Sequence, residues 1–207
     1  AYGNDTLIDI EKLRGSSFDD WLTGNASANI LNGGGGADIM YGGRGADIYV
    51  TDGGDSIVEN LNAGTDTVQS FASHALSANV ENLVLIGSAA IDGTGNTLDN
   101  RIIGNAANNI LSGNGGADRM EGGLGDDTYV TDGGDTLIEA ANAGTDTVQS
   151  SESHSLAANF ENVTLTGRRA INATGTAASN RIIGNVSSNR LDGGGGNDRM
   201  EGGRGHA

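Results

Sequence analysis

Cysteine and proline are both missing from this 207-residue chain, and lysine occurs once, at Lys12. Without cysteine the chain can form neither a disulfide scaffold nor a cysteine-ligated zinc or iron–sulfur site. Without proline it cannot form a collagen triple helix. Basic residues are few: 11 Lys and Arg stand against 27 Asp and Glu, which gives a formal net charge of −16 at pH 7. Because a nucleic-acid binder needs a basic surface, this balance argues against nucleic acid as a partner.

Long apolar runs are missing too. The longest extend over a few residues, such as 83–86, whereas a membrane-spanning helix needs about 20. The chain therefore predicts no membrane span. Its N-terminus has no basic segment followed by an apolar one, so no secretory signal peptide is predicted. Residues 202–207 end inside a repeated motif, and we expect the chain to be a piece of a longer protein.

The sequence motifs of common enzyme classes are absent as well. The chain contains no G-x-S-x-G of a serine hydrolase, no H-E-x-x-H of a zinc protease and no Gly-Lys pair of a phosphate-binding loop. We therefore expect no catalytic centre in this segment. His74 and His154 occupy equivalent positions of a repeat, and we expect them to serve in turns or in side-chain packing. Tyr49 and Tyr129 are expected in the core.

Glycine, in contrast, is abundant, and it belongs to long repeats. The 36 glycines are about 17% of the chain, against roughly 7% in an average protein. Residues 51–70 return at 131–150 with 15 of 20 positions identical, so the chain is a tandem array of an 80-residue unit. We divide the chain into units at 1–94, 95–174 and 175–207, and we expect all three to continue as one solenoid.

A nine-residue period runs inside each unit. Residues 33–41 and 42–50 follow the form G-G-x-G-x-D-x-U-x, in which U is a large apolar residue. Other copies have fewer glycines, or Asn in place of Asp. The copies begin at residues 15, 24, 33 and 42, at 95, 104, 113 and 122, and at 175, 184, 193 and 202, the last one truncated.

This form resembles the calcium-binding nonapeptide of the RTX (repeats-in-toxin, haemolysin-type) family. The connecting segments 127–135 and 159–167 are also similar to those of bacterial RTX arrays. The array is similar to C-terminal regions of secreted bacterial proteins and to accessory modules of mannuronan epimerases. The resemblance implies an all-β fold, a right-handed parallel β-roll or β-helix solenoid, with calcium bound in the glycine-rich turns.

The chemistry of the nonapeptide favours calcium independently of the family. Glycine at positions one, two and four permits positive φ, so the backbone can bend around an ion and aim carbonyl oxygens at it. The Asp at position six adds a carboxylate, and Ca²⁺ takes six to eight such hard oxygen ligands. The x-U-x that follows is a short strand with its middle side chain inward. Two nonapeptides then complete one coil, and turns two nonapeptides apart stack about 4.8 Å from each other.

The family places calcium between such stacked turns. The stacked pairs are Asp20 with Asp38, Asn29 with Asp47, Asn100 with Asp118, Asn109 with Asp127, and Asn180 with Asp198. Beyond the clusters, Asp52 and Asp55 are expected to cap the Asp38 turn, Asp132 and Asp135 the Asp118 turn, and Asp66 and Asp146 the Asp47 and Asp127 turns. The predicted calcium-binding residues are Asp20, Gly33, Gly34, Gly35, Gly36, Asp38, Gly42, Gly43, Arg44, Gly45, Asp47, Asp52, Asp55, Asp66, Gly113, Asn114, Gly115, Gly116, Asp118, Gly122, Gly123, Leu124, Gly125, Asp127, Asp132, Asp135, Asp146, Gly193, Gly194, Gly195, Gly196 and Asp198.

Not every turn is expected to hold an ion. The turns with Asn at position six lack the carboxylate, and we expect them to be weak or metal-free, with their amides bonded to the neighbouring coil. The glycine-rich turns then suggest on the order of half a dozen ions. Segments 51–94 and 131–174 have no such turns but show alternation of apolar and polar residues, so we interpret them as wider, metal-free coils.

Arginines at outward-facing position seven leave two interpretations open. They are Arg101, Arg119, Arg181, Arg190 and Arg199. In the first interpretation they pair with acidic residues at position nine, namely Glu121, Glu201 and Asp192. In the second they form a cationic stripe for an anionic polysaccharide.

Two functions correspond to these interpretations. In the first, the chain is a calcium-binding module that folds outside the cell and serves as the secretion and stabilisation region of a larger secreted bacterial protein. The resemblance then implies export by type I secretion machinery through the parent chain. In the alternative, the chain is an accessory module that binds an alginate-type polysaccharide for a carbohydrate-active enzyme.

Overall fold

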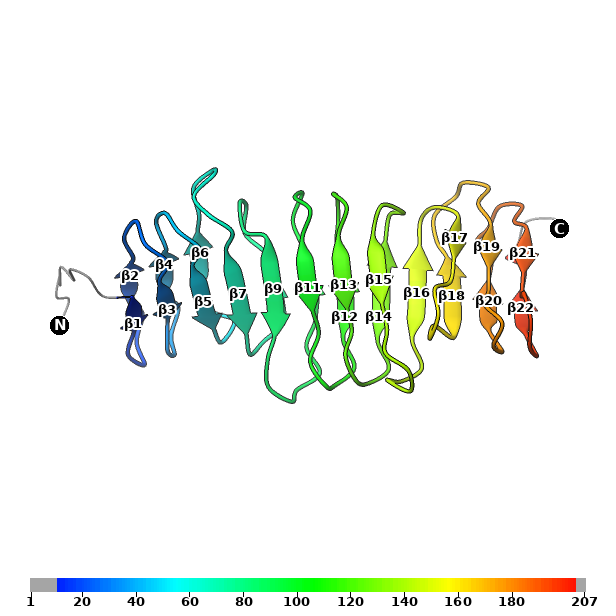
Figure 1. Cartoon of the computed structure of the whole chain (residues 1–207), viewed down its shortest axis with the longest axis horizontal. Coiled ribbons are helices and arrows are strands. Elements are labelled where there is room, and N and C mark those ends of the chain that lie inside the picture. The colour runs from blue at the N-terminus through cyan, green and yellow to red at the C-terminus, as the bar shows by residue number, and fades with distance from the viewer. Residues whose placement is uncertain (1–10, 204–207) are drawn as a thin grey trace.

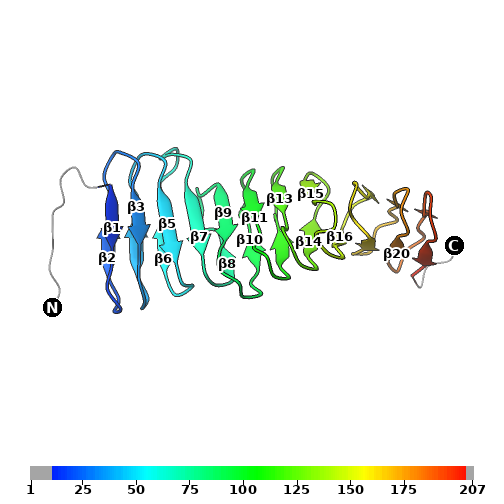
Figure 2. The same cartoon turned by 60° about the horizontal axis from the view of Figure 1, so that its bottom comes forward.

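The computed structural model describes residues 11–203, which form an elongated stack of short parallel β-strands (Figure 1). Within this range there are 22 strands and no helix, and two strands per coil make about 11 coils. The strands lie across the long axis and follow each other from the N-terminal to the C-terminal end (Figure 2). The predicted all-β parallel solenoid is therefore confirmed. The truncated nonapeptide that begins at Gly202 runs beyond the described residues.

Odd-numbered strands pair with odd-numbered strands and even with even, so each coil contributes one strand to each of two faces. On the odd face, one sheet contains β1 (Lys12–Arg14), β3 (Ile30–Asn32), β5 (Ile48–Thr51), β7 (Thr67–Ser70), β9 (Asn82–Leu85), β11 (Arg101–Ile103), β13 (Arg119–Glu121) and β15 (Thr136–Ile138), followed by a sheet of β17 (His154–Ser155), β19 (Ala173–Thr174) and β21 (Leu191–Asp192). On the even face, one sheet contains β2 (Trp21–Thr23), β4 (Ile39–Tyr41) and β6 (Ser56–Val58), followed by a sheet of β8 (His74–Ala75), β10 (Gly93–Thr94), β12 (Ile110–Ser112), β14 (Thr128–Thr131), β16 (Thr147–Ser150), β18 (Asn162–Leu165), β20 (Arg181–Ile183) and β22 (Arg199–Glu201).

The core of the nonapeptide clusters is built from the U side chains, as position eight predicts. Leu31, Met40 and Tyr49 are fully buried, and so are their equivalents one unit later. The neighbours of the U residue point outward, which leaves Trp21 67% exposed. Met200 departs from the pattern with 51% exposure, because no described coil covers it. Each strand of a cluster thus contributes one side chain to a narrow core.

Strand register follows the period in the nonapeptide clusters and departs from it in the connecting segments. Leu22 pairs with Met40, two nonapeptides later. In the segment after the first cluster, Ile48 pairs with Thr67, which makes a coil longer than two nonapeptides, whereas Thr67 pairs with Asn82, which makes a shorter one. The expectation of wider coils in 51–94 and 131–174 is wrong, since long and short coils alternate there.

Each 80-residue unit contains an odd number of strands. β5 and β14 are equivalent in sequence and nine strands apart, so one lies on the odd face and the other on the even face. Equivalent turns of successive units therefore lie at opposite edges of the solenoid. No helix in residues 11–203 is long and apolar enough to cross a bilayer.

We expect the turn glycines to differ sharply in their tolerance of a methyl group. Gly116 has φ of 121°, and a Cβ there would lie 2.7 Å from the carbonyl carbon of Leu98. A Cβ on its neighbour Gly115 would have no other heavy atom within 4 Å. Gly116→Ala should lower the free energy of unfolding in calcium by about 1–3 kcal/mol, while Gly115→Ala should change it by less than about 0.5 kcal/mol. Denaturant unfolding of both variants checks this, and equal losses would contradict it.

Candidate metal centres

Coils of the nonapeptide clusters are joined by a repeated hydrogen bond to the position-six side chain. The backbone N–H of Asp20 donates to Oδ1 of Asp38 at 2.8 Å, and that of Asn29 donates to Oδ1 of Asp47 at 2.7 Å. The same bond joins Asn100 to Asp118, Asn109 to Asp127, and Asn180 to Asp198. The predicted stacking of turns two nonapeptides apart is confirmed.

The same bond continues into the connecting segments. Asp38 N–H donates to Oδ1 of Asp55 at 3.0 Å, and Asp47 N–H donates to Oδ1 of Asp66 at 2.8 Å. In the second unit Asp135 and Asp146 accept the equivalent bonds. Asp52 is exposed and lies farther out, with Oδ2 3.8 Å from the Cβ position of Gly35, and Asp132 is its exposed equivalent.

The second oxygen of these carboxylates has no hydrogen-bond partner although it is buried. This holds for Oδ2 of Asp38, Asp47, Asp55, Asp66, Asp118, Asp127, Asp135 and Asp146. They form four pairs on adjacent coils, which are 38 with 55, 47 with 66, 118 with 135, and 127 with 146. A buried anionic oxygen without a hydrogen-bond partner lowers the stability of the fold. A cation between the paired carboxylates would remove this destabilisation. Hard carboxylate and carbonyl oxygens fit Ca²⁺.

Glycine serves this arrangement in two ways. At positions two and four it has positive φ, as at Gly34 and Gly36, and Asn114 takes this conformation with φ of 65°. At position one φ is not positive, which corrects the expectation. A Cβ on Gly33 would instead lie 2.9 Å from Oδ2 of Asp55 and closer still to Oδ2 of Asp38. Position one must be glycine because the paired carboxylates converge on its Cα.

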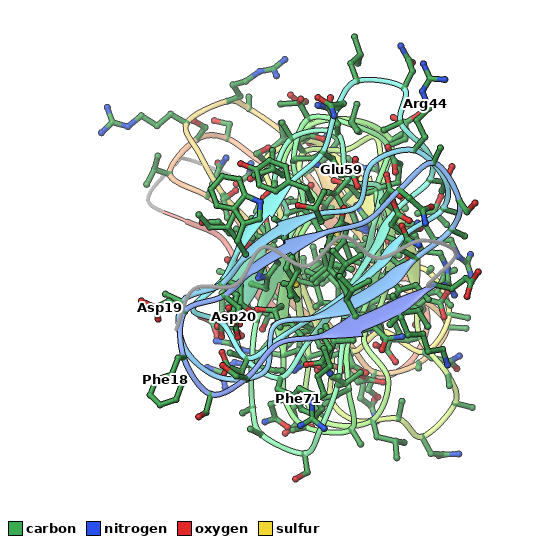
Figure 3. All side chains as sticks on the ribbon, turned by 90° about the vertical axis from the view of Figure 1, so that its left-hand side faces the viewer. Phe18, Asp19, Asp20, Arg44, Glu59 and Phe71 are labelled. Carbon is green, nitrogen blue, oxygen red and sulfur yellow. The ribbon has the colours of Figure 1, made fainter. Side chains whose placement is uncertain are left out.

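The remaining predicted glycine-turn residues fall into the same pattern. Positive φ at positions two and four is also found at Gly43, Gly45, Gly116, Gly123, Gly125, Gly194 and Gly196. At position one, Gly42, Gly113, Gly122 and Gly193 each face the Asp of their own turn. The third-position residues are exposed at Arg44, Leu124 and Gly195 and half-buried at Gly35 and Gly115. Arg44 lies at the periphery of the end-on view (Figure 3).

Most turns with Asn at position six have both ends of the amide hydrogen-bonded within the protein, except that Oδ1 of Asn189 is buried without a partner. Oδ1 of Asn100 accepts the N–H of Asn96 in its own turn at 2.7 Å, and its Nδ2 donates to the carbonyl of Val80 in the preceding coil at 3.1 Å. The expected amide bonds between coils are therefore present. Asp20 behaves like these Asn residues, because its Oδ2 accepts the N–H of Ser16 at 2.5 Å. This bond lowers the pKa of Asp20, which sets it apart from the paired aspartates.

Comparison with known protein families agrees with this geometry. The family model described as "RTX calcium-binding nonapeptide repeat (4 copies)" matches residues 14–49, 94–129 and 174–206, about half of the chain. The chain belongs to this family. No curated protein matches the chain. The RTX matches coincide with the three nonapeptide clusters, whereas the connecting segments lie outside them.

Two glutamates that were not among the predicted ligands lie beside the RTX turns. Glu59 is close to Asp47 and Asp66, and one oxygen of each of the three lies within 4.8 Å of the others. Glu139 stands in the same relation to Asp127 and Asp146. The spacing of Glu59 from the nonapeptide aspartates does not follow the nine-residue period, so the period could not reveal it. The one signal in the sequence is that Glu59 and Glu139 occupy the same position of the 80-residue repeat.

The outward arginines of the predicted stripe are all matched by carboxylates. Arg101 and Arg119 both bond Glu121, at 3.0 and 2.7 Å. In the third unit Arg181 and Arg199 share Glu201, and Arg190 pairs with Asp192. The first interpretation of these arginines is confirmed. Tyr49 and Tyr129 lie in the core as expected, and His74 and His154 are half-buried.

Burial changes the acidity of the paired carboxylates. It raises the pKa of Asp118 to about 6 and that of Asp127 to about 7, with repulsion from Asp135 and Asp146 adding to the effect. Burial also raises the pKa of Asp38, Asp47, Asp66 and Asp146. The RTX fold without metal therefore favours protonated carboxyls, and a bound cation would favour the ionised form.

This difference predicts opposite pH dependences with and without calcium. Between about pH 4 and pH 7 the metal-free fold binds more protons than the unfolded chain, so its stability falls as pH rises through that window. In calcium the apparent affinity should rise over the same window, because protons compete with the cation. Circular dichroism from pH 4 to pH 8, in chelator and in calcium, measures both. A metal-free chain that gains β-structure with rising pH would contradict the expectation.

Proposed function

We propose that this RTX chain is a calcium-driven folding module of a larger secreted bacterial protein. It acts as a structural repeat module, and its calcium ions lie between paired turns of the solenoid. The observation that carries the proposal is the four pairs of aspartates, each with a buried oxygen that lacks any hydrogen-bond partner. Such pairs oppose folding when they are charged and stabilise the fold when a cation joins them.

The shape of the core supports a requirement for metal. Each ordered residue costs about 1–2 kcal/mol of backbone entropy, and glycine costs more. A core that takes at most two side chains from each short strand offers little buried apolar surface against this cost. With a net charge of −16, the carboxylates also repel each other. Calcium both cancels charge and joins neighbouring coils, so its binding energy becomes folding energy.

The proposed location follows from the calcium concentrations on the two sides of the cell membrane. Extracellular calcium modules bind at about 10⁻⁴–10⁻³ M, weaker than cytosolic sensors. A chain with such affinity stays unfolded in the cytosol and folds outside, which suits export through type I secretion machinery by the parent chain. We do not extend the proposal to polysaccharide binding, because the outward arginines of the stripe are paired with Glu121, Glu201 and Asp192.

Calcium should therefore switch the chain between an unfolded and a folded state. In excess chelator at neutral pH we expect the circular dichroism of a disordered chain, and at sub-millimolar to millimolar calcium a cooperative rise of β signal. Millimolar Mg²⁺ should not replace calcium, because it demands tight octahedral geometry and keeps its water ligands. A stable β spectrum in chelator would overturn the proposal.

Calcium stoichiometry should depend on the paired aspartates. Asp118→Asn removes the charge of one pair member and should abolish at least one bound ion, as measured by calorimetric titration. Asp20→Asn is the matched control: its carboxylate is satisfied within its own turn, and an amide there reproduces the neighbouring Asn turns. Its stoichiometry should equal that of the parent chain. Equal losses in the two variants would show that the pairs do not define the sites.

A further inference from the structure

Two of the four aspartate pairs have a third carboxylate, and this divides the candidate sites into two kinds. We call Asp47, Glu59 and Asp66 the first triad, and Asp127, Glu139 and Asp146 the second triad. Every member is more than nine-tenths buried; Asp66 is fully enclosed and Glu59 is 7% exposed. The other two pairs, 38 with 55 and 118 with 135, have no such partner within the described residues.

The triads hold unsatisfied oxygens that point at one spot. Oδ2 of Asp47 and of Asp66 is buried without a hydrogen-bond partner, while Oδ1 of each accepts a backbone N–H. In the second triad a Cβ on Gly122 would lie 2.5 Å from both Oε1 of Glu139 and the hydroxyl oxygen of Tyr129, and closer still to Oδ2 of Asp127. Carboxylate and phenol oxygens thus surround a space that only glycine leaves open.

Each glutamate is held in place by a tyrosine of the core. The hydroxyl of Tyr49 donates to Oε1 of Glu59, and that of Tyr129 donates to Oε1 of Glu139. The turn that carries Glu59 is also fixed to the last nonapeptide turn, because Gly45 N–H donates to the carbonyl of Ala63 at 2.8 Å. In the end-on view Glu59 lies inside the outline of the stack (Figure 3).

We propose that each triad is a metal site for one hard cation, Ca²⁺ under physiological conditions, that binds more tightly than the two-carboxylate pairs and fills first. The inference rests on the proposed function in that it invokes the same ion. Three charged ligands on a rigid frame raise affinity over two. Tyr49 and Tyr129 act as positioning residues, since they orient a ligand oxygen without providing charge.

If the triads bind calcium first, their position would let the bound ion fix how neighbouring coils align. Each triad joins the last turn of a nonapeptide cluster, 42–47 or 122–127, to the first long turn of the connecting segment, 59–66 or 139–146. In the first unit the coil at this turn is one residue longer than two nonapeptides, since Ile30 pairs with Ile48 but Ile48 pairs with Thr67. An ion there fixes the register at the junction, and the remaining turns then stack upon it.

The test compares full-length chains that differ in one carboxylate. Glu59→Gln and Glu139→Gln keep the size of the side chain and an acceptor for tyrosine, but remove the charge. Calcium binding is measured by competition with a chromophoric chelator, and Tb³⁺ emission excited through tyrosine reports ions near Tyr49 and Tyr129. We expect two tight sites in the parent chain. Each variant should lose one, with an affinity lowered by at least the roughly 10–100-fold that the loss of an outer-shell partner costs, because the glutamate is itself a ligand.

Two further variants separate the site from general effects. Glu121→Gln is the control, because the carboxylate of Glu121 pairs with Arg101 and Arg119 on an outward face, and it should leave both tight sites and their terbium emission in place. Tyr49→Phe keeps the core volume and every carboxylate, and should weaken the first site while calcium at higher concentration still induces the β signal.

The outcomes are distinct. Loss of one tight ion per glutamate variant, with the weaker ions retained, supports the inference. A parent chain with one uniform class of sites, or a Glu59→Gln/Glu139→Gln double variant with unchanged affinities, would overturn it while leaving the proposed calcium-driven folding intact. A parent chain that binds no calcium would overturn the proposed function itself.

Discussion

One hydrogen bond, repeated from coil to coil, organises this protein. The backbone N–H at position six of a turn donates to the carboxylate of the next coil, as from Asp38 to Asp55. That bond fixes the register of the turns, and it satisfies one oxygen of the acceptor while burying the other without a partner. In the aspartate turns, stacking and unsatisfied charge therefore arise from the same contact.

Turns with Asn at position six and turns with Asp at position six differ in how their side-chain oxygens are satisfied. An amide such as that of Asn100 satisfies both of its ends, with Oδ1 toward its own turn and Nδ2 toward the preceding coil. A carboxylate has no donor to offer, so Asp118 needs a cation where Asn100 needs none. The chain alternates the two kinds along one stack. Its coils thus combine turns whose amides are bonded within the protein with turns whose carboxylates keep a buried oxygen without a partner, which agrees with the proposed calcium-dependent folding.

The connecting segments contribute carboxylates to the candidate metal centres as well as spacing between the clusters. They supply Asp55 and Asp66 to the ends of the nonapeptide clusters and bring Glu59 beside one of the resulting pairs. Since a unit has nine strands, the second unit repeats this arrangement at the opposite edge of the solenoid. The buried carboxylates are therefore distributed along both edges of the solenoid. On the faces between these edges, the outward arginines form ion pairs with other carboxylates.

The parallel solenoid, the U side chains of the core and the stacking of aspartates two nonapeptides apart could all be predicted from the amino-acid sequence. These features follow from a local period, because each nine-residue copy builds the same turn and strand. The sequence did not predict that position-one glycine is needed for close approach of Asp38 and Asp55, that long and short coils alternate in the connecting segments, or that Glu59 faces Asp47. These three features depend on contacts between coils, since the path of a long turn depends on the coil beneath it, and a carboxylate becomes part of a site only when two separate turns bring it there.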